Sequence, residues 1–246
     1  MGLFDVFRGV FDKSDVETAR TALQQAAEPA GKTDALTALI QRVLAIGLDG
    51  RGFYKGAAAV GDAASKHHEG DAEKAIDSLA RGGVLTAGAG GFVTSLGGFV
   101  TMTAAIPVNV LTFYVTAART VGAIAHLRGY DIKDATVRTA ILLTMIGANA
   151  TEVLRAAGLP LSSSVGALAT RRLPSAAAMV VNKAIAFRLV KMVGERALVR
   201  AGRAVPVLGG GVGALFDGAM LHRIGEAARR EFPPVVRPVE RDWGVR

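Results

Sequence analysis

Cysteine is absent from the 246-residue chain. Its absence excludes a disulfide scaffold, thiol catalysis and a thiolate metal site, and it fits a reducing compartment. Aromatic residues make up only 6% of the chain, whereas glycine occurs 30 times, so we expect closely packed helices in place of a core of bulky side chains. The low charged fraction, 20% against 50% hydrophobic residues, excludes intrinsic disorder as the main state.

Alternating patterns typical of β-strands are also missing. The chain instead shows helical periodicity with glycine and proline at the turns, which predicts an all-α fold. We expect one compact helical domain over residues 14–232, preceded by an amphipathic arm at residues 1–13 and followed by an extended or disordered tail at residues 233–246. The predicted helices cover residues 14–27, 34–48, 56–65, 71–80, 108–127, 132–154, 176–201 and 206–230.

Formal charge is missing from residues 82–118, a run of 37 residues bounded by Arg81 and Arg119. A bilayer crossing takes about 20 apolar residues, so this length allows two short passes or one hairpin. The many glycines and Pro107 favour a Gly/Ala-rich helix hairpin that bends near residues 97–98 and again at Pro107. Small residues recur at every fourth position in this run and again after Pro206. The first stripe comprises Gly83, Ala87, Gly91 and Ser95, and the second comprises Gly209, Gly210, Gly213, Ala214, Asp217 and Gly218. We expect the two stripes to pack together.

The first thirteen residues form an amphipathic pattern. At helical spacing the apolar side chains fall on one side, opposite Asp5, Arg8 and Asp12. This face predicts an interfacial membrane anchor, and a terminal helix docked on the protein's own core explains it equally well. No secretory signal pattern is present, so the expected location is cytoplasmic. The lipid-binding residues predicted here are Leu3, Phe4, Phe7, Val10 and Phe11.

Positive charge is concentrated in one segment of a chain whose net charge is +8. Residues 166–203 hold eight Lys or Arg against a single Glu, and the other segments are nearly balanced. An anionic membrane surface attracts such a segment by about 1 kcal/mol per cation. Nucleic acid would also need aromatic side chains for base stacking, and Phe187 is the only aromatic residue in the segment, so nucleic acid is an unlikely partner. The cations predicted to meet lipid are Arg188, Lys191, Arg196, Arg200 and Arg203.

Arg119 is the only formal charge between residues 82 and 127. A guanidinium inside an apolar segment must reach a surface or meet an acceptor, and the candidates are Asp131, Asp217 or a lipid phosphate. The favoured interpretation is an internal ion pair with Asp217. Tyr130 and Asp131 follow Gly129 and are expected to cap and turn a helix more than to touch a ligand.

The remaining motifs predict no catalytic site, no metal and no cofactor. His67 and His68 are adjacent and point about 100° apart on a helix, which suits a solvated helix junction better than a metal site. The glycine runs lack the Gly-Lys-Ser/Thr triplet of a phosphate-binding loop and follow no predicted strand. Residues 162–164 are three serines without the Gly-x-Ser-x-Gly context of a nucleophile.

Two blocks of the sequence resemble the EcsC family of bacterial proteins. The first contains Ala105-Ile106-Pro107-Val108-Asn109-Val110, then Arg119 and Arg128-Gly129-Tyr130-Asp131; the second contains Val205-Pro206-Val207-Leu208-Gly209-Gly210-Gly211-Val212-Gly213-Ala214, Asp217 and residues 224–232. The resemblance covers about residues 50–232. It implies a helical protein that is cytosolic or associated with a membrane, and it implies no defined biochemical activity.

These observations together predict a non-enzymatic protein on the cytoplasmic face of the inner membrane. It would bind anionic lipid through the N-terminal phenylalanine face and the basic helix, because one weak signal gives only marginal attachment. Three alternatives remain: an enzyme on lipid-like substrates in a cleft with Arg119 and Asp217, a pore-forming hairpin at residues 82–118, and a module that binds a membrane protein, another protein or a second copy of itself.

Overall fold

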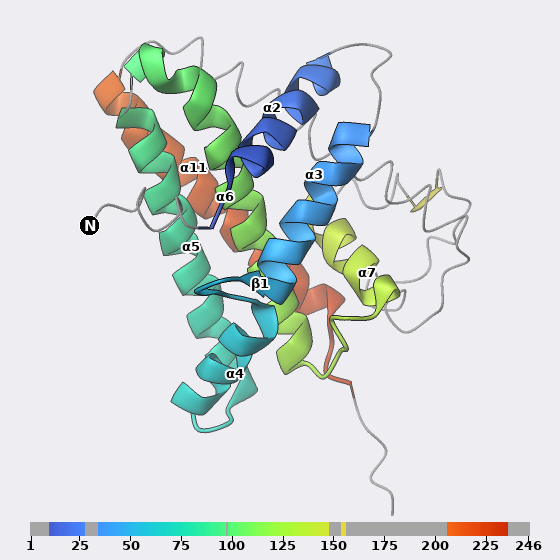
Figure 1. The fold of residues 1–246 in the computed structure, drawn as a ribbon. Helices are drawn as coiled ribbons and strands as arrows, with labels where there is room; N and C mark the ends of the chain where they lie inside the picture. Colours follow the sequence, from blue (N-terminus) through green and yellow to red (C-terminus); the bar gives the residue numbers. More distant parts are fainter. Residues whose placement is uncertain (1–9, 28–33, 97, 148–153, 156–205, 236–246) are drawn as a thin grey trace, which may run out of the picture.

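The computed structural model describes residues 10–27, 34–96, 98–147, 154–155 and 206–235, and within these ranges the protein is almost entirely α-helical (Figure 1). The predicted all-α fold is confirmed. The elements are α2 (Lys13–Ala27), α3 (Asp34–Leu44), a π-helical turn η1 (Ala45–Asp49), β1 (Gly50–Arg51), β2 (Tyr54–Lys55), α4 (Ala57–His67), α5 (Ala72–Leu96), α6 (Gly98–Leu127), α7 (Ala135–Ile146) and α11 (Pro206–Glu231).

A short β-hairpin is the one sheet in the described ranges. β1 and β2 pair antiparallel, with Gly50 opposite Lys55 and Arg51 opposite Tyr54. Gly50 adopts φ +84°, and a Cβ there would lie only 2.6 Å from the carbonyl oxygen of Tyr54, so this position requires glycine. The sequence predicted a turn here, and the structure adds the two-residue strands on either side.

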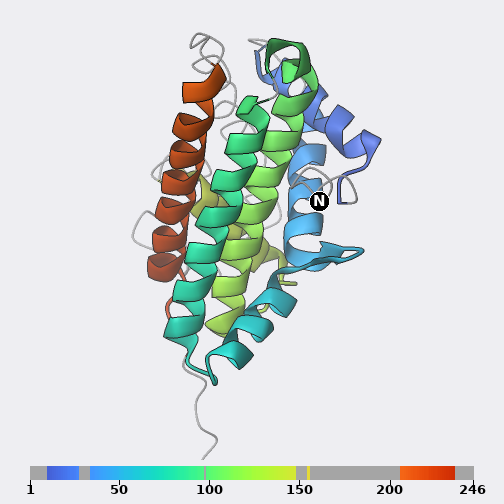
Figure 2. The same ribbon diagram turned by 90° about the vertical axis from the view of Figure 1, so that its left-hand side faces the viewer.

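Helices α5 and α6 form the predicted hairpin (Figure 2). α5 ends at Leu96 and α6 begins at Gly98, so the first expected bend is confirmed. Pro107 does not end α6, which remains helical on both sides of it. A proline removes one backbone hydrogen bond, and a long helix that neighbouring helices support tolerates that loss.

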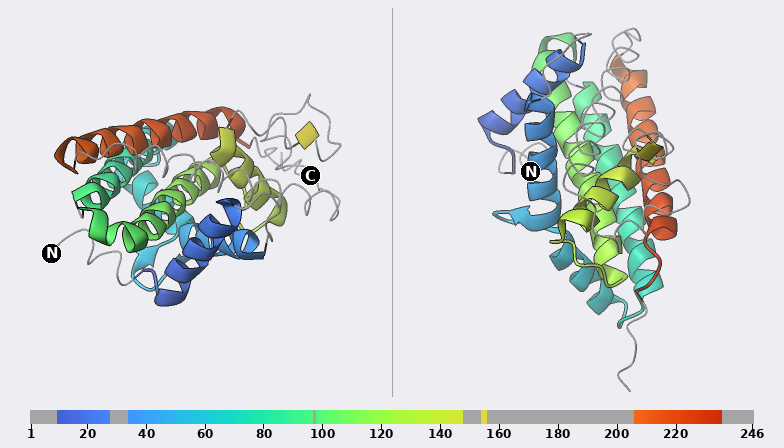
Figure 3. Two further views of the ribbon diagram at one scale, coloured as in Figure 1. Left: turned by 90° about the horizontal axis from the view of Figure 1, so that it is seen from above. Right: turned by 90° about the vertical axis from the view of Figure 1, so that its right-hand side faces the viewer.

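Helix α6 is the centre of the molecule. Seen from above, it lies between α5 and α11 on one side and α2 and α3 on the other (Figure 3). Its residues 110–118 are all buried. The segment Val110–Leu127 is long and apolar enough to cross a membrane, and it is the one such segment in the described helices; here 83% of it is buried by the rest of the protein.

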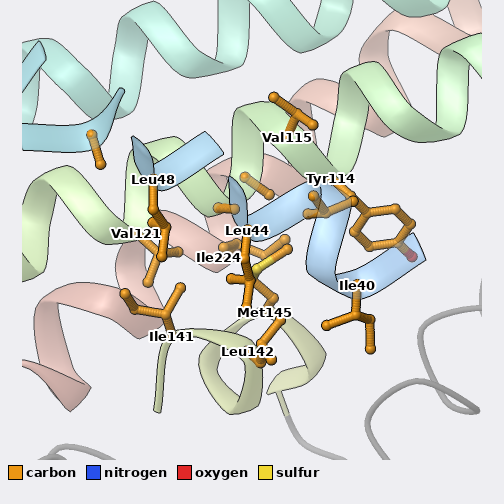
Figure 4. Close-up of a cluster of buried hydrophobic side chains, with 14 of the residues drawn as sticks. Ile40, Leu44, Leu48, Tyr114, Val115, Val121, Ile141, Leu142, Met145 and Ile224 are labelled. Carbon is orange, nitrogen blue, oxygen red and sulfur yellow. The ribbon is translucent and has the colours of Figure 1, made fainter. Parts of the chain in front are cut away.

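The hydrophobic core extends from α6 toward α3, α7 and α11. Leu44 and Leu48 meet Val121 of α6, and side chains of α7 and α11 close the cluster (Figure 4). Gly122 makes this approach possible, because an added Cβ would lie 2.4 Å from Cδ2 of Leu48. Close-packed interiors of this kind have no room for an additional methyl group.

Helices α5 and α11 pack on each other, and glycines lie at the described contacts, each against a side chain outside the opposite stripe. A Cβ on Gly218 would lie 3.3 Å from Cγ1 of Val84, and one on Gly225 would lie 3.6 Å from Cβ of Ala80. The side chains of the remaining small residues, at positions 87, 91, 95, 209, 210, 213 and 214, lie outside what the structure describes.

The ends of α6 and α7 follow from local capping. Gly129 has φ +90°, its N–H donates to the carbonyl of His126 at 2.9 Å, and the N–H of Tyr130 donates to that of Ala125 at 3.1 Å. These two bonds form a Schellman motif that ends α6. Asp134 then accepts from the N–H of Thr136 at 2.7 Å, so α7 begins three residues later than the predicted start at residue 132. The predicted helix at residues 176–201 lies outside the described residues.

Candidate functional site

The start of the described chain corrects part of the predicted lipid-binding face. Val10 and Phe11 are buried, at 1% and 7% exposure, and belong to the hydrophobic core. Residues 10–12 are not helical, so the predicted amphipathic helix does not extend to residue 13. These two side chains are therefore unavailable to a lipid surface, whereas Leu3, Phe4 and Phe7 lie outside the described residues.

Asp12 explains why the helix begins where it does. Its carboxylate accepts from the N–H of Asp15 at 2.8 Å, and the Asp15 carboxylate accepts from the N–H of Asp12 at 2.9 Å. This reciprocal pair is a capping box, which fixes Asp12 in a non-helical conformation and starts α2 at Lys13. The apolar side chains before Asp12 can then turn into the core.

Asp15 also joins three separate parts of the chain. It is fully buried, and its two carboxylate oxygens bind Arg42 of α3 and Arg51 of β1. Arg51 further donates to the backbone carbonyl of Val10 at 3.4 Å. We call Asp15, Arg42 and Arg51 the Asp15 anchor. It holds the β-hairpin beside the point where the N-terminal segment enters the fold.

Phe53 lies in the turn of this β-hairpin and is 67% exposed. Its neighbours Gly52 and Lys55 are exposed as well. Since Arg51 binds both Asp15 and the Val10 carbonyl, the exposed ring lies on an element tied to the N-terminal segment that carries Leu3, Phe4 and Phe7. The sequence analysis did not single out Phe53, because exposure of one aromatic residue in a turn leaves no periodic signal.

Arg119 contacts an aromatic ring. Its guanidinium carbon lies 4.3 Å from the centroid of the Tyr54 ring, a cation–π arrangement. Burial raises the pKa of the Tyr54 hydroxyl, against the smaller lowering effects of the neighbouring Arg119 and Thr116. The phenol therefore remains neutral at physiological pH and offers no general base.

The predicted ion pair between Arg119 and Asp217 is not among the interactions of the described residues. The backbone N–H of Arg119 lies beside Gly47 in η1, whereas its neighbour Thr120 contacts Gly83 of α5. Adjacent helical residues point about 100° apart, so Arg119 faces η1 and β2 while α5 and α11 pack on another side of α6. Asp217 is buried on α11, at 4% exposure.

Tyr130 and Asp131 act as structural residues. Tyr130 is buried and packs edge-to-face on Phe232 at the end of α11, with 5.1 Å between ring centroids. Asp131 is exposed, and its carboxylate accepts from the N–H of Lys133 at 2.9 Å. The capping and turning roles predicted for this pair agree with these contacts.

Histidines in the described part of the chain build no metal site. His67 and His68 have rings 4.9 Å apart at the end of α4, and no group of three potential ligands occurs among the described residues. His126 pairs instead with Asp62, with 2.7 Å between Nε2 and Oδ1.

Six of the eleven arginines in the described ranges pair with carboxylates. Besides the Asp15 anchor, Arg128 pairs with Glu73 at 2.7 Å, Arg138 with Asp49, and Arg229 with Asp77. The predicted lipid-binding cations Arg188, Lys191, Arg196, Arg200 and Arg203 lie outside the described residues.

Comparison with known proteins bears on the chain as a whole. The sequence profile of the EcsC protein family matches residues 13–233, which begin at the first residue of α2 and extend beyond α11. The chain belongs to the EcsC family. No curated protein and no solved structure matches it. The EcsC match includes the Asp15 anchor, the β-hairpin and the α5–α6 hairpin, and it leaves out Leu3, Phe4 and Phe7.

Proposed function

We propose that this EcsC family member is a non-enzymatic peripheral protein on the cytoplasmic face of the inner membrane, where it binds anionic lipid. The segregation of charge carries the proposal. Carboxylates of the described helices pair with most of the arginines there, whereas residues 166–203 carry eight cations and one anion. A cationic segment that lacks acidic neighbours in sequence is attracted to an anionic surface.

The geometry at the N-terminus supports a second, apolar contact. Arg51 ties the β-hairpin, which carries the exposed Phe53, to the carbonyl of Val10, and Val10 follows the segment with Leu3, Phe4 and Phe7 in the sequence. Attachment by two such signals is stable where a single one is marginal. The alternative of an enzyme built on Arg119 and Asp217 receives no support from the described contacts, because Arg119 faces Tyr54.

Flotation with vesicles tests the proposal. The full-length protein is mixed with vesicles of phosphatidylcholine alone or with about one third phosphatidylglycerol, and we expect recovery with the anionic vesicles only. Reversing two charges in the cationic segment, Arg188→Glu with Lys191→Glu, should weaken binding by at least about tenfold, given about 1 kcal/mol per cation and four charge units changed. Equal recovery with both vesicles, or with neither, would contradict electrostatic attachment.

A matched control places the same change elsewhere. Lys66 on α4 and Arg230 on α11 are exposed, outside the cationic segment. The variant Lys66→Glu with Arg230→Glu alters net charge equally, and we expect it to bind nearly as well as the unmodified protein. Equal loss in both variants would mean that net charge, and not this segment, governs attachment.

A further inference from the structure

Three uncharged stretches, far apart in the sequence, meet at one end of the molecule. α5 carries no ionisable side chain over residues 82–96, α6 none over residues 98–118 except the buried Tyr114, and α11 none over residues 206–216. We call these three stretches the uncharged end. They form the second half of α5 but the first half of α6 and α11.

The directions of the helices bring these halves together. α5 and α6 form a hairpin, so the end of α5 lies beside the start of α6 (Figure 2). α11 runs antiparallel to α5, because Gly218 contacts Val84 while Gly225, further along α11, contacts Ala80, earlier in α5. The start of α11 therefore lies beside the end of α5 as well.

The change from charged to uncharged sequence occurs at the same height in all three helices. Gly83 marks that height, since an added Cβ would lie 2.8 Å from Oγ1 of Thr120 on α6 and 3.0 Å from Cδ2 of Leu221 on α11. Just on the charged side, Arg81, His222 and Arg223 are exposed. On the uncharged side of the Gly83 height, Asp217 is buried and the guanidinium of Arg119 lies over the Tyr54 ring.

Large aliphatic side chains are exposed just beyond this boundary. Leu85 on α5 is 73% exposed and Leu215 on α11 is 76% exposed. They are two of the four large exposed hydrophobic residues in the described ranges, and both belong to the uncharged end. An apolar surface of this kind marks a site that another apolar phase covers.

We propose that the face of the uncharged end that α5 and α11 form together inserts into one leaflet of an anionic bilayer while α5, α6 and α11 stay folded against each other. The inference deepens the proposed function and rests on it. α2 packs on α6 at the same end, and Asp12 just before α2 and Glu17 within it are exposed, so the face that enters lipid is the one on the other side of α6, where α5 and α11 lie (Figure 3). The cationic segment ends at Arg203, three residues before α11 begins at Pro206, so lipid that binds this segment is close to the start of α11. Insertion is therefore partial, and the buried residues 110–118 need not leave the core.

Site-specific fluorescence tests the insertion directly, because the chain has no native cysteine. The variants Leu85→Cys and Leu215→Cys each carry a polarity-sensitive dye in the full-length protein. With phosphatidylglycerol-containing vesicles we expect a blue shift at both positions and quenching by spin labels on the lipid acyl chains. Ala63→Cys, on the exposed side of α4 below the boundary, is the control and should respond to neither.

The outcomes separate the two proposals. Flotation without a dye response at residues 85 and 215 would overturn insertion and leave surface binding standing, whereas failure to float would overturn both. A dye already shielded without vesicles, in a protein that sediments as a dimer, would assign the uncharged end to a second copy of the chain. An equal response at residue 63 would indicate unfolding onto the membrane and would also overturn the inference.

Added charge provides an independent test. Leu85→Lys with Leu215→Lys places two cations on exposed sites of the uncharged end, and Ala59→Lys with Ala63→Lys places two on exposed sites of α4. Placing Lys at the depth of the acyl chains is costly. We therefore expect spin labels on the acyl chains to quench the dye at least about tenfold less in Leu85→Lys with Leu215→Lys than in the unmodified background. The dye for this readout sits on Gly82→Cys, an exposed position of the uncharged end on α5. The α4 variant should keep the signal, and equal circular dichroism spectra would show that both remain folded; full quenching in the first variant contradicts insertion.

Discussion

Asp15 is the residue on which the N-terminal part of the fold depends most. The carboxylate is fully buried and binds two arginines whose side chains are 31% and 38% exposed. The arginines can regain some hydration when the pair is broken, so the cost lies below that of an entirely buried pair. The Asp15 anchor thus stabilises α2, α3 and β1 against each other.

Replacing Asp15 by Asn should lower the free energy of unfolding by about 2 to 4 kcal/mol. The amide keeps the size of the side chain but removes the charge, and its NH2 group faces a guanidinium donor. Urea unfolding followed by circular dichroism measures the change. Glu17→Gln is the control, since Glu17 pairs with Arg20 on the surface, and we expect a change below about 0.5 kcal/mol. Equal effects of the two substitutions would refute the structural importance of the anchor.

Asp12 gives the start of α2 a dependence on pH. Hydrogen bonds from the Ser14 hydroxyl and the Asp15 N–H lower the pKa of the Asp12 carboxyl below its ordinary value of 3.8. A carboxyl with a lowered pKa in the folded state stabilises that state above the ordinary value and loses this effect as pH falls through the lowered pKa. Amide exchange at residues 13–16 should therefore accelerate, relative to intrinsic rates, between about pH 4 and pH 2. In Asp12→Ser the cap does not titrate, and an unchanged acid response in that variant would exclude Asp12 as its source.

Individual residues also show what the sequence revealed and what it did not. Arg119 was identified from the sequence because it stands alone in an apolar region, and the structure confirms that it contacts a specific group. The contact that the structure describes is with Tyr54, which carries no charge and lies 65 positions away in the chain. Charge counting finds an unusual cation, but it cannot find a cation–π partner.

At the scale of elements, two adjacent glycines of α5 have opposite structural roles. A Cβ on Gly83 would lie 2.8 Å from Oγ1 of Thr120 and 3.0 Å from Cδ2 of Leu221, whereas one on Gly82 would meet nothing within 4 Å. Leu221 is only 1% exposed and has little freedom to move away. Gly83 is thus required for helix packing, and Gly82 is not.

Alanine at these two positions should therefore act in opposite directions. Gly82→Ala gains up to about 1 kcal/mol of helix propensity. Gly83→Ala gains the same amount but adds an overpacking cost of about 1 to 3 kcal/mol, so the two variants should differ in stability by that cost. Thermal unfolding of both proteins measures the difference. Similar melting temperatures would show that α5 and α11 can separate without penalty.

The elements themselves were predictable where capping residues mark their ends. Pro206 starts α11, Gly129 ends α6, and the bend between α5 and α6 follows from the paired glycines. The N-terminal arm was not predictable in the same way. Helical periodicity placed Val10 and Phe11 on an apolar face, but periodicity does not tell whether lipid or the protein's own core covers that face, and the capping box at Asp12 ends the pattern.

At the scale of the whole molecule, the sequence predicted the fold class, the α5–α6 hairpin and the packing of α11 on that hairpin, but not which residues of the three helices lie at one level. Gly83 meets Thr120 of α6 and Leu221 of α11, which lie 37 and 138 positions away in the chain, and these contacts set the level at which the three helices pack. No local signal predicts such contacts, and the uncharged end exists only because of them. The sequence showed where charge is missing, and the topology shows that the missing charges share one end.

The two proposed membrane contacts should respond differently to salt. Attraction between the cationic segment and anionic lipid is screened, since the Debye length falls from about 10 Å at 0.1 M salt to about 3 Å at 1 M. Insertion of the uncharged end depends on apolar burial and is not screened. Protein mixed with vesicles in about 1 M NaCl should thus bind much more weakly than protein mixed with them in about 0.1 M NaCl. Protein that is first bound at about 0.1 M NaCl should stay on the vesicles when the salt concentration is then raised. Leu85→Lys with Leu215→Lys should elute readily after the same treatment, while Ala59→Lys with Ala63→Lys should not. Complete elution of the unmodified protein by salt would leave electrostatic attachment as the whole interaction, because an inserted apolar end would have held the protein on the vesicle.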